Sequence, residues 1–401
     1  MSRNTTLDAA GEGRSDGGDV DVAVVGGGAV GVTTAADLAA RGATVTLFER
    51  GELASESSGR AAGVLYDAYA EDVDAALAIR AMDRFRALDD SLPGFSFTPC
   101  PYVIAVREGD ADADAVPDMV ERMRSHGVDA SVVEPDALGD RFPLETADLA
   151  VAAVAEGGGW TDPGSYVRAM GGRARREGVT VETGVEAQLP GPAPTLHVDG
   201  AGHEFDAVVV AVGAHTSRFL ADAGIPVPVK PYRVQALVSD APYAGPMTYD
   251  ATAGVYFRPH PEGLLAGDGT VPTEADPNDY DGEADDWFRE ETSETLRERA
   301  DYGASIDRAW AGLCTATPDG DPLVGPIADG VFVAAGWQGH GFMRAPAVGE
   351  HLAEGVLASL DGSSPDAPGS PWIEAFDPDR FDGDEAFVIR EGMTVRSRSG
   401  E

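Results

Sequence analysis

A glycine-rich turn between an apolar strand and a helical segment is the feature that most restricts how this chain folds. Residues 21–25, DVAVV, have the length and composition of a buried strand, and the residues after the turn have helical spacing. Between them Gly26, Gly28 and Gly31 form the pattern GxGxxG, and a second strand-like segment ends at Glu49. This order of strand, turn, helix and acid-terminated strand predicts a dinucleotide-binding unit.

The chemistry of the turn explains why these residue types are needed. Gly26 permits a tight turn, Gly28 lets a pyrophosphate approach the backbone, and Gly31 lets the helix pack close to the strand. The helix N-terminus offers N–H groups and a partial positive charge to the phosphates. Glu49 is placed to bind the hydroxyl groups of the adenosine ribose, and an acid at this position disfavours the 2′-phosphate of NADP.

A second glycine-rich turn lies near the other end of the chain, in GWQGHGFMRAP at 336–346. It follows an apolar strand at 329–336 and precedes a helix that we expect to start near Phe342. Between the two turns lie a buried strand at 206–216, period-two patterns from 227 to about 270, and an acidic helical stretch. This order predicts a dinucleotide fold that is split by an inserted β-rich module.

The charge of the chain excludes some partners. The formal net charge is −40, and a surface this acidic repels the phosphates of nucleic acids. A single lysine, Lys230, accompanies 28 arginines, and the acids are spread along the whole sequence. This composition is typical of a cytoplasm of very high salt, where the Debye length falls to about 3 Å and self-repulsion is screened.

Other classes of protein are excluded by what the sequence lacks. No run of about 18 apolar residues is present, so no membrane span is expected. Residues 1–19 lack the apolar core of a secretory signal, and we expect them to form a disordered lead. The two cysteines, Cys100 and Cys314, cannot build a disulfide framework, and no cysteine or histidine spacing predicts a metal site. We therefore expect a cytoplasmic protein without a bound metal.

Eight segments, in order from about residue 20 to 360, carry a family resemblance. They are VVGGGAVGVTTAADLAARGATVTLFER, SSGRAAG, GGWTDP, DAVVVAVGAHTSRFL, VKPYRVQ, VYFRPHPEGLLAGD, WAGLCTATPDGDPLVG and AAGWQGHGFMRAPAVGEHLAEGV. Together they resemble the D-amino-acid-oxidase-like (DAO) superfamily of FAD-dependent oxidoreductases. The sequence looks most like sarcosine oxidase β-type chains, the β-chain of L-proline dehydrogenase and glycine oxidases.

The resemblance implies an α/β fold, α+β overall, with a split Rossmann-like FAD-binding domain and an inserted, mainly antiparallel β-sheet substrate domain. The expected FAD-binding domain comprises residues 20–90, 151–226 and 308–362, the substrate domain 91–150 and 227–307, and a C-terminal tail 363–401.

In this family FAD extends between the two glycine-rich turns. Its adenosine lies at the first turn and its isoalloxazine ring beside the second, where the following helix directs its positive end at the ring. The residues that match FAD-contacting segments are Gly26, Gly28, Ala29, Val30, Gly31, Glu49, Arg50, Ser57, Ser58, Arg60, Ala61, Gly63, Val185, Ala211, Gly213, Gly312, Gly336, Gly339, His340, Gly341, Phe342 and Met343.

Four positions depart from the relatives. Gly312 stands where some sarcosine oxidases carry the cysteine that links FAD, so the resemblance implies noncovalent FAD. Leu265 and Met343 stand where monomeric sarcosine oxidases carry lysines, which favours a dehydrogenase or multi-subunit enzyme over an oxidase. Cys314 stands where glycine oxidases carry arginine and several sarcosine and proline enzymes carry tyrosine.

Three residues are the catalytic candidates that the resemblance implies. Tyr256 matches an active-site tyrosine, and Arg258 follows two residues later on the same side of one strand, where it could clamp a substrate carboxylate. A surface ion pair is an equally good interpretation of Arg258, and Arg60 is an alternative clamp. His340 could hydrogen-bond flavin or substrate, or only pack against the ring edge. Arg344 is expected to point away from the site.

The family oxidises C–N bonds next to a carboxylate by hydride transfer to flavin N5. The resemblance therefore implies an FAD-dependent oxidoreductase of an amino acid or an N-methyl or secondary amino acid. The same fold also hosts oxidation of hydroxy acids or polyols, and the chain could be the flavin-holding subunit of an electron-transfer dehydrogenase. The electron acceptor (oxygen, a quinone or a carrier protein) and a role for oligomers or hetero-subunits remain open.

Overall fold

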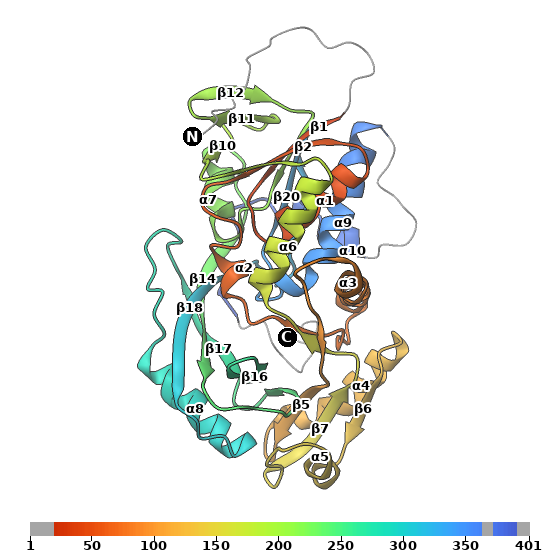
Figure 1. Ribbon diagram of the computed structural model, residues 1–401, viewed down its shortest axis with the longest axis vertical. Coiled ribbons are helices and arrows are strands. Elements are labelled where there is room, and N and C mark those ends of the chain that lie inside the picture. The colour runs from red at the N-terminus through yellow and green to blue at the C-terminus, as the bar shows by residue number, and fades with distance from the viewer. Residues whose placement is uncertain (1–19, 363–371, 391–401) are drawn as a thin grey trace.

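The computed structural model describes residues 20–362 and 372–390. The lead expected at 1–19 and part of the expected tail, 363–371 and 391–401, lie outside the described residues. Figure 1 shows a helix-flanked sheet in the upper part of the molecule and a second, larger sheet in the lower part.

The upper sheet has six strands in the order β19-β20-β13-β1-β2-β9, and all neighbouring pairs except β19 and β20 run parallel. Its strands are β1 (Asp21–Val25), β2 (Thr44–Glu49), β9 (Thr180–Thr183), β13 (Ala207–Val210), β19 (Leu323–Ala328) and β20 (Val331–Ala335). β1, β13 and β20 are nearly or fully buried, as the continuous apolar runs in the sequence predict for the centre of a parallel sheet.

Helices cover this sheet closely because their contact faces carry small residues. α1 (Ala29–Ala40) packs against α6 (Pro163–Arg176) and α9 (Gly341–Leu360), and α9 packs against α3 (Asp72–Ser91). A Cβ atom on Gly349 would lie 2.6 Å from Thr33 Cγ2. Only glycine therefore allows this approach of α9 to α1, which fixes both helices relative to the sheet.

The lower sheet has eight strands in the order β18-β14-β17-β16-β15-β5-β7-β6, and only β15 and β5 run parallel. Its strands are β5 (Tyr102–Arg107), β6 (Ala130–Val133), β7 (Leu149–Ala155), β14 (Lys230–Ser239), β15 (Met247–Asp250), β16 (Val255–His260), β17 (Gly263–Glu274) and β18 (Ile306–Ala316). The predicted fold class, a split Rossmann-like domain with an inserted and mainly antiparallel sheet, is confirmed.

Two of the expected domain boundaries, at 151 and 308, fall inside β7 and β18. Both strands pair along their length with other strands of the eight-stranded sheet. The chain therefore changes from one sheet to the other after residue 155 and after residue 316, which the residue patterns alone did not reveal. The division into domains otherwise stays a prediction.

The remaining elements are short strands, helices and 3₁₀ turns outside the two large sheets. The short strands are β3 (Val64–Leu65), β4 (Thr98–Pro99), β8 (Gly159–Trp160), β10 (Ala187–Gln188), β11 (Thr195–Val198) and β12 (Ala201–Glu204). The other helices are α2 (Ser57–Arg60), α4 (Val116–Ser125), α5 (Pro135–Arg141), α7 (Thr216–Asp222), α8 (Asp286–Ala300) and α10 (Trp372–Ala375), with 3₁₀ turns η1 (Ala111–Ala115), η2 (Gly213–His215) and η3 (Pro378–Arg380).

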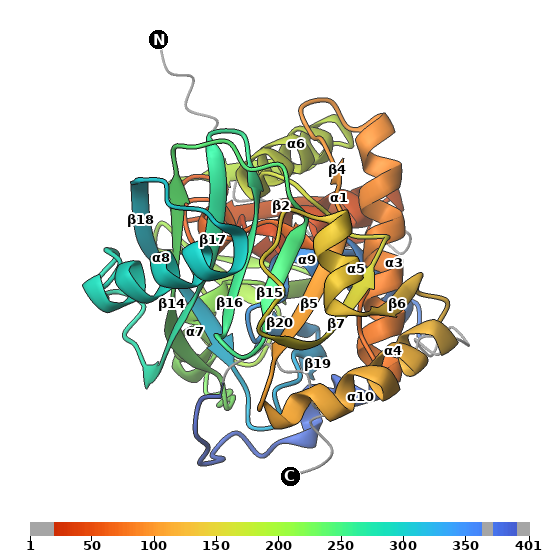
Figure 2. The same cartoon turned by 90° about the horizontal axis from the view of Figure 1, so that it is seen from below.

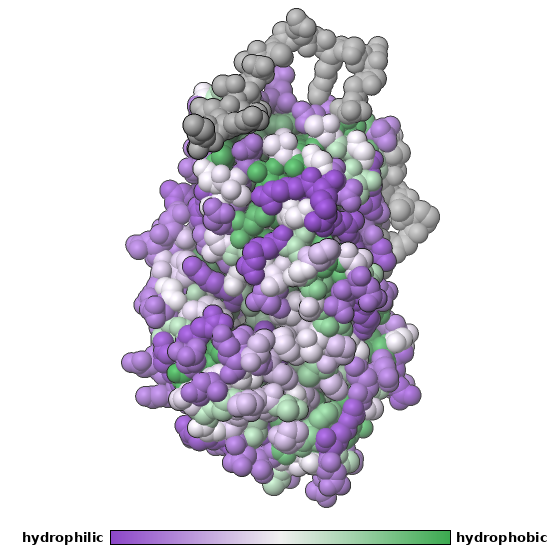
Figure 3. Space-filling view, in the orientation of Figure 1, coloured by the Kyte–Doolittle hydropathy of each residue, from purple (hydrophilic) through white to green (hydrophobic). Residues whose placement is uncertain are grey.

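One face of the eight-stranded sheet is covered by α8 and α5, as the view from below shows (Figure 2). Phe288 and Leu296 of α8 and Leu138 of α5 join one apolar cluster with Phe257 and Leu264 of the sheet. On the outside of the molecule, hydrophilic residues cover much of the face seen in Figure 3. Among the helices of the described residues, none is long and apolar enough to span a membrane.

Candidate active site

The first glycine-rich turn joins β1 to α1 at the carboxyl end of the parallel strands. Gly26 has φ +112°, and a Cβ atom there would lie 2.3 Å from the carbonyl oxygen of Ala211. A Cβ atom on Gly31 would lie 1.9 Å from the carbonyl oxygen of Gly26. Gly28 is the N-cap of α1, which has no acidic residue in its first turn. The turn thus leaves the positive N-terminus of α1 open to an anion.

Glu49 lies at the end of β2, directly beside this turn. Its Oε2 accepts a hydrogen bond from the backbone N–H of Gly27 at 2.7 Å, and its Oε1 accepts one from Gly51 at 2.7 Å. These two bonds orient the carboxylate, and each oxygen keeps a second lone pair for a ligand hydroxyl.

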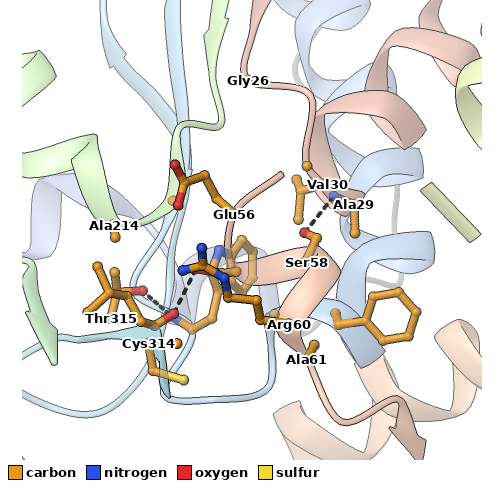
Figure 4. A pocket seen from close by; sticks show the side chains of 18 of the residues that line it. Gly26, Ala29, Val30, Glu56, Ser58, Arg60, Ala61, Ala214, Cys314 and Thr315 are labelled. Atoms are coloured by element: carbon orange, nitrogen blue, oxygen red, sulfur yellow. Dashed lines mark hydrogen bonds between the residues drawn. The ribbon is translucent and has the colours of Figure 1, made fainter. Parts of the chain in front are cut away.

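The short helix α2 links the turn to the other half of the site. Ser58 Oγ accepts a hydrogen bond of 3.0 Å from the backbone N–H of Ala29, and Ser57 Oγ donates one of 2.7 Å to the carbonyl oxygen of Leu313 (Figure 4 draws the first of these). Figure 4 also shows Arg60 extending from α2 toward the strand that carries Cys314 and Thr315. α2 is therefore held by side-chain bonds to both α1 and β18.

A single cavity of about 570 Å³ extends from the first turn to the second. Most of the predicted site residues line it. They are Gly26, Gly28, Ala29, Val30, Glu49, Arg50, Ser57, Ser58, Arg60, Ala61, Gly63, Val185, Ala211, Gly213, Tyr256, Gly312, Gly339, His340, Gly341, Phe342 and Met343. Gly31, Gly336 and Arg258 do not. The structure thus brings together segments that lie about 300 residues apart in the sequence.

The second turn needs glycine for its backbone conformation. Gly336 and Gly339 have φ of +79° and +86°, and Gln338 between them has φ +49°. Gly336 does not line the cavity. A Cβ atom there would lie 2.4 Å from the Thr317 methyl carbon, so this glycine serves the turn itself. α9 begins at Gly341 with His340 as its N-cap and no acidic residue in its first turn. Its positive end is therefore directed at the cavity wall.

Tyrosines and a cysteine border the end of the cavity near α9. Tyr66 stacks on Tyr102 with ring centroids 4.3 Å apart, and its Oη lies 3.4 Å from His340 Nε2. Burial is the main cause that raises the pKa of Tyr66, Tyr102 and Tyr256, so all three phenols are neutral over the physiological range. Burial also raises the pKa of the Cys314 thiol to about 12.

Arg258 does not lie where the sequence placed it. Residues two apart in a strand share a face, but the Arg258 side chain, 2% exposed, lies outside the cavity wall. Its Nε donates to the carbonyl oxygen of Ala62 at 2.7 Å, its Nη1 donates to that of Pro259 at 2.6 Å, and its guanidinium lies over the Trp160 ring. The guanidinium is thus already occupied by protein groups, and burial lowers its pKa to about 10.

Three arginines of the described residues line the cavity instead: Arg50, Arg60 and Arg218. Arg50 pairs with Glu56 at 3.2 Å and contacts His215. Arg60 lies 5.8 Å from the centroid of the Tyr280 ring. Arg344 does not line the cavity; it pairs with Asp74 and lies over Tyr69. Arg60 is therefore better placed than Arg258 to meet a ligand anion.

A family model described as FAD dependent oxidoreductase (DAO) matches residues 21–355. The chain belongs to the DAO family. This DAO-family enzyme is similar to the tRNA 5-methylaminomethyl-2-thiouridine biosynthesis bifunctional protein MnmC of Caulobacter sp. (29% identity; 84% of this chain, 54% of that protein) and to glycine oxidase of Pseudomonas aeruginosa (27% identity; 88% and 98%). It thus spans about half the length of the first relative and almost all of the second.

Among solved structures, the DAO-family chain is similar to L-proline dehydrogenase from P. horikoshii, with a TM-score of 0.80 and 26% identity over 90% of this chain and 98% of that one. The family resemblance stated from the sequence is confirmed, and so is FAD as the cofactor.

The residues of the cavity fit FAD. The open N-terminus of α1 and the glycine turn suit the pyrophosphate, and Glu49 suits the ribose hydroxyls. At the far end, Gln338 lines the cavity, and its buried Oε1 has no hydrogen-bond partner among the described residues, so it can accept a bond from a ligand N–H. Among the described residues, no group of three or more His, Cys, Asp or Glu side chains could hold a metal ion.

Several cavity residues escaped the sequence interpretation. Tyr66, Tyr232, Asp268 and Gln338 all line the cavity but are not among the predicted site residues. Tyr232, Asp268 and Gln338 lie in segments that carry the family resemblance, whereas Tyr66 lies outside them. The only local signal at Asp268 is a following glycine, Gly269, in a strand. Asp268 has φ +134° and Gly269 has φ +48°, which marks a kink that the sequence only hints at.

Proposed function

We propose that this DAO-family enzyme oxidises the C–N bond of an amino acid or an N-methyl or secondary amino acid. One observation carries the proposal: a single cavity extends from the dinucleotide turn of α1 to an end beside the N-terminus of α9 that aromatic residues line. The names of relatives support the substrate class, since they include glycine oxidase, monomeric sarcosine oxidase and 4-methylaminobutanoate oxidase.

When bound, FAD supplies the acceptor for the hydride that leaves the substrate carbon. The protein's part is to bind and orient. The N-terminus of α1 holds the pyrophosphate, Glu49 holds the ribose, and the N-terminus of α9 stabilises negative charge at the ring end. Arg60 pairs with the substrate carboxylate, and the neutral phenol of Tyr256 and the imidazole of His340 position the substrate by hydrogen bonds.

The finer expectations belong to the same proposal. FAD is noncovalent, because Gly312 offers no linking thiol and the Cys314 thiol is neutral at physiological pH. Leu265 and Met343 stand in place of lysines, which favours a dehydrogenase. Such an enzyme passes electrons to a quinone or a carrier protein, alone or with partner subunits, and oxygen is the competing acceptor. The acidic composition favours a cytoplasm of high salt.

An anaerobic screen tests the proposal. The holoenzyme is mixed with glycine, sarcosine, proline and other amino acids, and with matched hydroxy acids, and the loss of flavin absorbance is followed. Bleaching by amino acids supports the proposal. Bleaching by hydroxy acids alone shows that the enzyme oxidises C–O bonds, and no bleaching of the isolated chain shows that it works only as the flavin-holding subunit of a larger complex.

In the same preparation, acid precipitation should leave the yellow flavin in the supernatant, whereas flavin in the pellet contradicts noncovalent binding.

A further inference from the structure

Asp268 brings a carboxylate to the cavity, and no cation of the described residues pairs with it. The residue is 8% exposed, and its Oδ1 accepts a hydrogen bond of 2.7 Å from Thr270 Oγ1. Its Oδ2 is buried and has no hydrogen-bond partner in the described part of the chain. A buried carboxylate is normally paired with a cation or fully hydrogen-bonded, because desolvation of the charge is otherwise costly. This carboxylate therefore lacks a partner that a ligand could supply.

The backbone is bent to hold Asp268 in this place. Asp268 has φ +134°, a conformation that residues other than glycine rarely adopt. It pairs with Gln235 of β14 at a point where the register between β14 and β17 shifts. Such an irregularity re-aims a side chain, and a strained backbone at a binding cavity is a common mark of function.

The charge of Asp268 acts on the aromatic end of the cavity. It raises the pKa of Tyr256, Tyr102 and Cys314, each of which is raised mainly by burial. Cys314 in turn borders the second turn, since its Sγ lies 4.0 Å from the position of a Cβ atom on Gly339. Asp268 therefore faces the end of the cavity where the substrate is expected to react, among rings whose faces also attract cations.

We propose that Asp268 binds the ammonium group of the incoming substrate, next to the carbon that is oxidised, accepts the proton that this nitrogen must lose before hydride transfer, and thereby selects amino acids over hydroxy acids. This inference rests on the proposed function. An ammonium group supplies both the hydrogen bond that Oδ2 lacks and a compensating positive charge. A hydroxy acid supplies a weaker donor and no positive charge. Its carboxylate is therefore repelled by Asp268 with no charge on its own heteroatom to offset the repulsion, although Arg60 pairs with the carboxylate of either substrate.

The test uses two probes that have no hydrogen on the carbon between carboxylate and heteroatom, and so cannot be dehydrogenated there: 2-aminoisobutyrate and 2-hydroxyisobutyrate. Binding of each to the holoenzyme is measured by calorimetry for the wild type and for Asp268→Asn, which keeps the shape and removes the charge. Asp268→Gly is the second variant, because glycine adopts φ +134° without strain. Asp67→Asn is the matched control, since Asp67 is also buried, also has an unpartnered oxygen, and does not line the cavity.

The wild type and Asp67→Asn should bind 2-aminoisobutyrate more tightly than 2-hydroxyisobutyrate. Both Asp268 variants should bind the amine about tenfold to hundredfold more weakly, as expected for the loss of a charge-assisted hydrogen bond, and should bind the hydroxy acid as well as before or better. The inference is overturned if the wild type does not prefer the amine, or if the preference survives in both variants. If amino acids bleach the flavin while that preference survives, the proposed function stands and only the role of Asp268 fails.

Discussion

Tyr66 Oη and His340 Nε2 lie 3.4 Å apart although 274 residues separate them in the sequence. Tyr66 follows the segment of α2, which is bonded to the first glycine-rich turn, and His340 is the N-cap of α9 at the second. The contact therefore joins residues that line one cavity from the two halves of the site. It agrees with the proposal that each glycine-rich turn holds one end of FAD.

Gly31→Ala should abolish FAD binding, whereas Gly355→Ala should not. A Cβ atom on Gly31 would lie 1.9 Å from a backbone oxygen in the cofactor turn, so the turn must move. Gly355, in the middle of α9, has no heavy atom within 4 Å of the same position, and alanine there should stabilise the helix by up to about 1 kcal/mol. Flavin absorbance per protein and the melting temperature of each variant are the measurements. Full flavin content in Gly31→Ala would contradict this assignment of the turn.

Arg60→Met and Arg258→Met should have different effects. Loss of Arg60 removes a cavity cation, so KM for the best carboxylate substrate should rise about tenfold to hundredfold at unchanged flavin content. Loss of Arg258 leaves the carbonyl oxygens of Ala62 and Pro259 without their donor, so we expect about 2 kcal/mol lower stability and a change in KM below threefold. Steady-state kinetics and thermal unfolding separate the two. A large KM effect in Arg258→Met alone would restore Arg258 as the clamp.

The sequence allowed most of the elements to be predicted, because their patterns depend on local neighbours. The apolar runs of β1, β13 and β20 and the spacing of α1 and α9 follow directly from burial on a parallel sheet. α2 has only four residues and is stabilised by bonds to Ala29 and Leu313, so no local pattern could predict it.

The sequence placed both glycine turns at the cavity, but it misplaced the Arg258 side chain and missed Asp268. Glycine turns have a sequence signature because their conformation is local. The direction of the Arg258 side chain depends on the carbonyl groups of Ala62 and Pro259 with which it forms hydrogen bonds. The position of Asp268 at the cavity depends on a register shift between strands β14 and β17. Neither can be derived from alternation along a strand.

Cys314 should react slowly with iodoacetamide, at a rate that rises about tenfold per pH unit between pH 7 and 9. Burial raises its pKa to about 12, and the nearby Asp268 adds to this, so only a small fraction of the thiol is ionised in that range. The thiolate is the reactive species. As long as the pH stays below the pKa, each unit rise in pH increases the thiolate fraction, and with it the rate, about tenfold. Mass spectrometry of the Cys314 peptide gives the rate, with denatured protein as the control. A rate that levels off near pH 8.5 would show an ordinary, exposed thiol.

The last prediction concerns salt. With a net charge of −40, the folded chain holds many like charges close together, and their repulsion favours expansion. The Debye length falls from about 10 Å at 0.1 M to about 3 Å at 1 M, so KCl should screen most of this repulsion by about 1 M. The melting temperature should rise steeply up to that concentration and more slowly above it.

Sucrose at matched osmolality is the control, because it stabilises proteins by exclusion from their surface and not by screening charge. A steep rise in KCl that sucrose does not reproduce would assign the effect to electrostatics. The surface also carries arginine–carboxylate pairs, such as Arg141 with Glu156 at 2.7 Å, and salt weakens these. If such pairs dominated over the net repulsion, the melting temperature would stay level or fall between 0.1 and 1 M KCl. The hypothesis that the protein is adapted to high salt would then be wrong.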